Sequence, residues 1–150
     1  MEKVIFLDVD GVLNCNKTTR KTTSGYTFVG NRQVKNLRHI INSTQAKVVL
    51  SSDWRYDRDD SRYNGDYLEL EAELMRYGIQ LYGFTPELPS AHRGTEIAQW
   101  LAEHTEVSNF VILDDRTDIE PNKDHWVQTT MSCGLGVAEA NQAIEILMKV

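Results

Sequence analysis

One short stretch near the N-terminus, residues 4–14, constrains the fold more than any other part of the sequence. Its apolar run Val-Ile-Phe-Leu predicts a buried strand of a parallel sheet, and Asp8 and Asp10 follow directly. Open α/β sheets bind their ligands where the strands end. Gly11 lets the chain turn away sharply without a Cβ atom in its path. Two carboxylates this close repel each other unless a cation lies between them, and hard oxygen ligands suit Mg²⁺.

Two later apolar runs have the same design. Residues 47–50 are followed by Ser51 and Ser52, and residues 110–113 are followed by an Asp-Asp pair. Because the carboxyl ends of parallel strands meet at one edge of a sheet, we expect these polar groups to gather there. Helical spacing of apolar residues predicts the connecting helices, and shorter apolar runs predict two further strands. The predicted helices span 31–42, 66–77 and 95–104 with one more at the C-terminus, and the short strands span 79–82 and 126–129.

Length and composition predict one globular domain over residues 1–150. A chain of 150 residues can bury a single core, and 25% charged with 41% apolar residues is ordinary for such a domain. The net charge of −6 argues against a surface that neutralises many phosphates of a long duplex. Small or singly contacted substrates fit better.

Cysteine usage and hydropathy predict a cytoplasmic protein. Cys15 and Cys133 are too few and too far apart for a disulfide framework or a CxxC metal site, so we expect free thiols. The chain shows neither a charged leader followed by an apolar run nor an apolar stretch of about 18 residues. We therefore expect no membrane partner.

The pattern Asp8-x-Asp10-Gly11 resembles motif I of the haloacid dehalogenase (HAD) superfamily of phosphatases. The resemblance implies a three-layer α/β Rossmann-like fold with a mostly parallel sheet. It also implies a covalent mechanism. Asp8 would attack phosphorus and become an aspartyl phosphate, while Asp10 would protonate the leaving group and then activate water. Gly11 would belong to the substrate-binding loop.

The hydroxyl groups after the second strand resemble motif II, which holds the phosphoryl group by a hydrogen bond. Ser51 is the first choice and Ser52 the alternative, because a register slip of one residue reverses which side chain faces the site. The pattern Ser-Ser-x-Trp-Arg is similar to that of small HAD proteins without a cap, some of which are associated with RNA repair. Arg55 would then contact a substrate phosphate. The other interpretation makes Trp54 a packed core residue and Arg55 its surface neighbour.

The remaining motifs follow in the superfamily's order. Arg93 stands where most members have a motif III Lys, although its reach and hydrogen-bonding fork differ from those of Lys. The pair after residue 113 resembles motif IV, with Asp115 as the expected direct Mg²⁺ ligand and Asp114 behind it. Asp8 and the backbone carbonyl of Asp10 would complete the protein ligands. Asp118 would contact a water molecule on the metal.

Residues 14–30 predict a β-hairpin flap rather than a cap domain, because the segment is too short to fold alone. The turn Ser24-Gly25 separates it into two arms, and the first arm carries Lys17, Arg20 and Lys21. These cations could steer phosphates or could simply keep the hairpin soluble. A neighbouring subunit of a homo-oligomer could cover such an uncapped site.

The sequence therefore predicts Mg²⁺-dependent hydrolysis of phosphate monoesters. The substrate could be a small molecule, a nucleotide or a terminal phosphate of a nucleic acid. The alternatives are a phosphotransferase and a HAD-fold protein that binds metal and phosphate without turnover.

Overall fold

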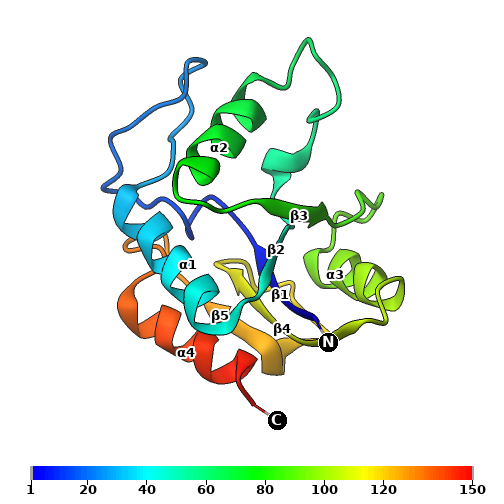
Figure 1. The fold of residues 1–150 in the computed structure, drawn as a ribbon. Helices are drawn as coiled ribbons and strands as arrows, with labels where there is room; N and C mark the ends of the chain where they lie inside the picture. Colours follow the sequence, from blue (N-terminus) through cyan, green and yellow to red (C-terminus); the bar gives the residue numbers. More distant parts are fainter. Residues whose placement is uncertain (1, 150) are drawn as a thin grey trace.

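The computed structural model describes residues 2–149, and its centre is a five-stranded parallel sheet in the order β3-β2-β1-β4-β5 (Figure 1). The strands are β1 (Glu2–Leu7), β2 (Lys47–Leu50), β3 (Leu81–Phe84), β4 (Val107–Asp114) and β5 (Trp126–Gln128). The helices are α1 (Asn31–Thr44), α2 (Gly65–Arg76), α3 (Arg93–Ala102) and α4 (Val137–Leu147), with short 3-10 turns at Asp53–Arg55 and Lys123–His125.

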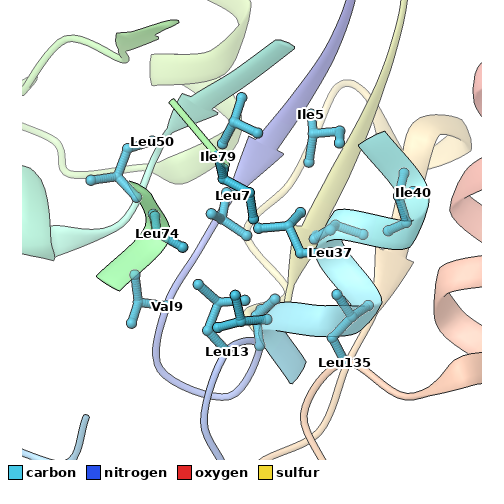
Figure 2. Close-up of a cluster of buried hydrophobic side chains, with 14 of the residues drawn as sticks. Ile5, Leu7, Val9, Leu13, Leu37, Ile40, Leu50, Leu74, Ile79 and Leu135 are labelled. Carbon is cyan, nitrogen blue, oxygen red and sulfur yellow. The ribbon is translucent and has the colours of Figure 1, made fainter. Parts of the chain in front are cut away.

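The helices form a layer on each face of the sheet. The larger apolar cluster joins the sheet to α1, α2 and α4, and Figure 2 shows Leu7 of β1 directed toward Leu37 of α1 and Leu74 of α2. The smaller cluster lies on the opposite face, where Ile97 and Trp100 of α3 pack. This arrangement confirms the predicted three-layer Rossmann-like fold, and residues 2–149 form no separate cap domain.

The strand order reverses direction at β1, which lies between β2 and β4. The connections through α1 and α2 build the sheet toward one edge, whereas α3 returns the chain to the other side of β1. Such a reversal leaves a crevice at the carboxyl ends of the central strands, where α/β proteins bind ligands. The candidate site residues occupy this position.

The third strand begins two residues later than predicted, at Leu81 instead of residue 79. The cause is the end of α2. Gly78 has a φ of +73°, and the Ile79 N–H donates to the Leu74 carbonyl at 2.9 Å. This is the hydrogen bond of a Schellman motif, so Ile79 completes the helix cap and the core before the strand can start.

The flap, residues 14–30, has hairpin pairing near its tip. The Thr22 N–H donates to the Tyr26 carbonyl and the Phe28 N–H to the Arg20 carbonyl, both at 2.8 Å. Side chains of α2 then hold the flap: Glu69 accepts from the Thr23 backbone and hydroxyl, and Asp66 accepts from the Ser24 hydroxyl. The flap and α2 therefore form one wall beside the ends of the strands (Figure 1).

No helix within residues 2–149 has both the length and the apolar character needed to cross a bilayer.

Candidate active site

Main-chain hydrogen bonds between strands fix the centre of the site. The Asp8 N–H donates to the Leu113 carbonyl at 3.1 Å, and the Ser51 N–H donates to the Leu7 carbonyl at 3.0 Å. Asp8 therefore lies between the residue that follows β2 and the acidic end of β4. The sheet itself brings together motifs that are more than a hundred residues apart in sequence.

Three carboxylates meet at this point. Asp8, Asp114 and Asp115 each offer an oxygen atom within 4.8 Å of the others, and the first two are buried. Burial and the neighbouring Asp8 carboxylate raise the pKa of Asp114 to about 8, and the same two causes raise the pKa of Asp115. Such crowding is unfavourable for three negative charges without a cation. The all-oxygen donor set fits a hard divalent cation.

Arg93 is the cation that the protein itself supplies to this cluster. Its Nη1 atom lies 2.7 Å from Asp114 and 3.3 Å from Asp8, and its Nη2 atom lies 3.6 Å from Asp53. Burial alone would lower the pKa of Arg93, but Asp114 and Asp8 raise it above its ordinary value. The structure thus brings Arg93 to Asp8, as the sequence predicted.

The start of α3 places Arg93. The His92 Nδ1 atom accepts from the Thr95 N–H at 3.1 Å, so His92 caps the helix, and Arg93 is its first residue. A Cβ atom on Gly94 would lie 2.5 Å from the carbonyl carbon of Ile119, so only Gly permits this approach to the loop after β4. Gly94 was not predicted as a site residue, although its place directly after Arg93 can be seen in the sequence.

Asp118 anchors the same helix start rather than the carboxylate cluster. Its carboxylate accepts from the Arg93 N–H at 3.1 Å and from Arg116 through Nε at 2.8 Å and through Nη2. The expectation that Asp118 contacts a metal-bound water is therefore not supported by its hydrogen bonds.

The two serines after β2 have different surroundings. The Ser51 hydroxyl is buried and has no hydrogen-bond partner among residues 2–149. The Ser52 hydroxyl accepts from the Trp54 N–H at 3.2 Å and caps the 3-10 turn. A buried polar group without a partner costs free energy unless a ligand or water satisfies it. The geometry thus favours Ser51, the first choice, as the hydroxyl available to a phosphoryl group.

Two side chains hold the carboxylate of Asp10. Asn14 donates to Oδ1 at 2.9 Å and the Trp54 indole N–H donates to Oδ2 at 3.1 Å. Asn14 is in turn fixed, because its Oδ1 atom accepts from the Gly11 N–H at 3.0 Å. Asp10 is exposed and lies outside the group of three clustered carboxylates. Trp54 belongs to the Ser-Ser-x-Trp-Arg pattern, but its contact with Asp10 was not predicted from the sequence, and neither was the role of Asn14.

A family model described as the HAD domain in Swiss Army Knife RNA repair proteins matches residues 4–140. The chain belongs to this family. Among curated proteins, none matches the sequence. The family match confirms the predicted HAD membership and agrees with the parallel sheet and the order of the motifs.

Gly11 of this HAD domain has a φ of +83°, in the left-handed region that favours glycine. A Cβ atom there would lie 2.6 Å from Cγ of Asp115 and 3.0 Å from the sulfur of Met131. The absence of a side chain therefore lets Asp115 approach the motif I loop. This steric role is separate from the predicted contact with substrate.

The structure corrects the prediction for Arg55. Its side chain is fully buried in the HAD domain, and all five of its N–H groups are engaged. Four of them donate to main-chain carbonyls and one donates to Glu96 at 2.9 Å. No donor remains for a substrate phosphate. The alternative of an exposed neighbour of Trp54 is wrong as well. The four carbonyls belong to Ser51, Ser52, Thr85 and Pro86.

The flap cations are also less available than the sequence suggested. Arg20 forms an ion pair with Glu73 of α2 at 2.8 Å and lies over the ring of Phe28. Lys21 donates to the Thr27 hydroxyl at 3.2 Å, and Lys17 is exposed. In this HAD domain, Arg20 mainly fastens the flap to α2.

Proposed function

We propose that this HAD domain hydrolyses phosphate monoesters through an aspartyl phosphate on Asp8. The observation that carries the proposal is the pair of groups on either side of that carboxylate. Arg93 lies 3.3 Å from Asp8, and the unpartnered hydroxyl of Ser51 follows the adjacent strand. A cation and a free hydrogen-bond donor beside a buried carboxylate suit a phosphoryl group that the carboxylate attacks.

The two steps use Asp8 and Asp10 in turn. An Asp8 oxygen attacks phosphorus while the bond to the leaving oxygen breaks, and protonated Asp10 gives its proton to that oxygen. The Asp10 carboxylate then takes a proton from water, whose oxygen attacks the aspartyl phosphate and releases inorganic phosphate and Asp8. The hydrogen bonds from Trp54 and Asn14 support this role, because they fix the carboxylate of Asp10, two residues after the nucleophile, without burying it.

Mg²⁺ is the cation that we propose for the carboxylate cluster, held by Asp8, Asp115 and the backbone carbonyl of Asp10. When bound, Mg²⁺ reduces the repulsion between these carboxylates and an incoming phosphate. Asp114 accepts from Arg93 through one oxygen and from the Arg116 N–H at 3.0 Å through the other, so it orients neighbours rather than binding the metal directly. This assignment agrees with the expectation from motif IV.

The substrate that we propose is a nucleotide or a terminal phosphate of a nucleic acid. The family description, which refers to RNA repair proteins, supports this choice. So does the lack of a cap domain among residues 2–149, since a site beside a narrow flap can admit a phosphate displayed on a larger body.

The test is phosphate release from a panel of esters, with Mg²⁺ and with excess chelator. The panel contains ribose 5-phosphate, nucleoside 3′- and 5′-monophosphates and oligonucleotides phosphorylated at either end. We expect release from at least one class with Mg²⁺ and none with chelator. Asp8→Asn, checked by mass spectrometry for deamidation, should abolish release while the fold is retained. No release from any ester would favour the alternative of a non-catalytic binding domain.

A further inference from the structure

A pocket of about 300 Å³ opens beside the candidate active site, between the flap and the chain that follows β2. This volume lies at the lower end for small-molecule sites. Five aromatic rings and three carboxylates line the pocket, and no basic side chain is among its lining residues. The aromatic residues are Tyr26, Trp54, Tyr56, Tyr63 and Tyr67, and the acidic residues are Asp53, Asp57 and Asp66. Tyr67 is the most buried of the five rings.

The pocket therefore has five rings, four of them tyrosines, and the fifth is the Trp54 indole that it shares with the active site. Trp54 donates its indole N–H to Asp10 at 3.1 Å, and Asp53 lies 3.6 Å from Nη2 of Arg93. Asp10 is the group that would protonate the leaving oxygen. The body of the leaving group should accordingly extend toward the pocket rather than toward the buried carboxylates.

The exposed rings suit a flat partner. Tyr26 on the flap is 66% exposed and Tyr63 on the chain before α2 is 65% exposed, although exposed aromatic side chains normally pack when they can. Stacking on such rings is a usual way to bind nucleobases. The carboxylates disfavour an anionic group and accept hydrogen bonds from amino groups, as Asp does from the N4 amino group of cytosine.

We propose that this pocket binds the nucleobase of the nucleotide whose phosphate is removed, and that it prefers a base with an exocyclic amino group. The proposal rests on the proposed phosphatase function and names its leaving group. A quaternary ammonium group is the other chemistry that aromatic rings with acidic neighbours recognise. A nucleobase fits better, because it offers flat faces to the exposed rings of Tyr26 and Tyr63.

The experiment compares substrates that differ only in the proposed contact. Ribose 5-phosphate lacks a base. Cytidine and uridine 5′-monophosphates both carry one, but cytosine has an amino group where uracil has a carbonyl. We expect kcat/KM for the cytidine nucleotide to exceed that for ribose 5-phosphate by about 5- to 150-fold, the range given by stacking of one base. The uridine nucleotide should lie between them. The corresponding 3′-phosphates form a second series, and phosphocholine tests the quaternary ammonium alternative.

The variants test whether the pocket causes this preference. Tyr26→Ala and Tyr63→Ala should lower kcat/KM for the cytidine nucleotide more than for ribose 5-phosphate, chiefly by raising KM. Tyr82→Ala is the matched control, because Tyr82 is 45% exposed on β3 and does not line this pocket. It should change neither value. Asp57→Asn should reduce the preference for cytidine over uridine.

The outcomes separate this inference from the function on which it rests. Activity on ribose 5-phosphate without a gain from the base, in both series, would overturn the nucleobase pocket and leave the phosphatase intact. Equal losses on both substrates in the two tyrosine variants, or a higher kcat/KM for phosphocholine than for the cytidine nucleotide, would overturn it as well. No phosphate release from any ester would instead contradict the proposed function.

Discussion

Ser51 and Ser52 are neighbours in sequence with opposite surroundings, and this difference gives a prediction at the scale of single residues. Ser51→Ala removes a hydroxyl that has no partner among residues 2–149, so the free energy of unfolding should hardly change. Its kcat/KM should fall about 10- to 100-fold, because a hydrogen bond to a charged phosphoryl group is lost. Ser52→Ala should instead lower the free energy of unfolding by about 1 kcal/mol through loss of the turn cap. Urea unfolding and steady-state kinetics on both variants measure the two effects, and the reverse pattern would assign motif II to Ser52.

Arg93 gives a second prediction at this scale. Arg93→Ala leaves Asp8, Asp114 and the phosphoryl group without their nearest cation, so kcat/KM should fall by about 10²- to 10³-fold. Arg93→Lys keeps the charge but not the fork, and it should retain a measurable part of the activity. Circular dichroism establishes whether both variants fold. Full activity in both would move the motif III role to another cation, such as Lys123.

At the scale of secondary-structure elements, the guanidinium of Arg55 joins the ends of β2 and β3 to α3. It donates to carbonyls after each strand and to the buried carboxylate of Glu96. Arg55→Ala should lower the free energy of unfolding by about 3–5 kcal/mol, since it leaves Glu96 buried without its partner. Arg62→Ala, at an exposed ion pair with Asp60, is the control and should unfold like the wild type. Urea unfolding measures both, and equal midpoints would show that the buried pair contributes little.

Elements were easier to predict from sequence than the contacts between them. Apolar runs ending in carboxylates or hydroxyls located β1, β2 and β4, because a buried parallel strand leaves a local pattern. The burial of Arg55 leaves no such local pattern in the sequence. Charged side chains are almost never fully buried without partners, and two of the partners of Arg55, Thr85 and Glu96, lie 30 and 41 positions later in the chain. The contact of Trp54 with Asp10, 44 positions apart, was hidden for the same reason.

For the whole molecule, binding of Mg²⁺ should raise the unfolding temperature, because the carboxylate cluster exists only in the folded chain. At a hundredfold excess over Kd, the gain is about 2.7 kcal/mol, or about 5–10 °C for a domain of this size. Thermal unfolding at constant ionic strength measures it without any need for turnover. Asp115→Asn should reduce the shift, whereas Asp124→Asn, remote from the cluster, should preserve it. An equal shift in both variants would place the metal elsewhere.

The hydrogen bonds that hold Asp8 and Ser51 run between main-chain atoms of adjacent strands, whereas the aromatic pocket is built from the flap, the chain between β2 and α2, and the first turn of α2. Substitutions of pocket residues that do not contact the reacting groups, such as Tyr26 and Tyr63, can therefore change which molecules are recognised while Asp8 and Ser51 keep their positions. This separation makes the domain adaptable. Laboratory selection for new substrates can concentrate on the exposed pocket residues, and natural divergence can follow the same route.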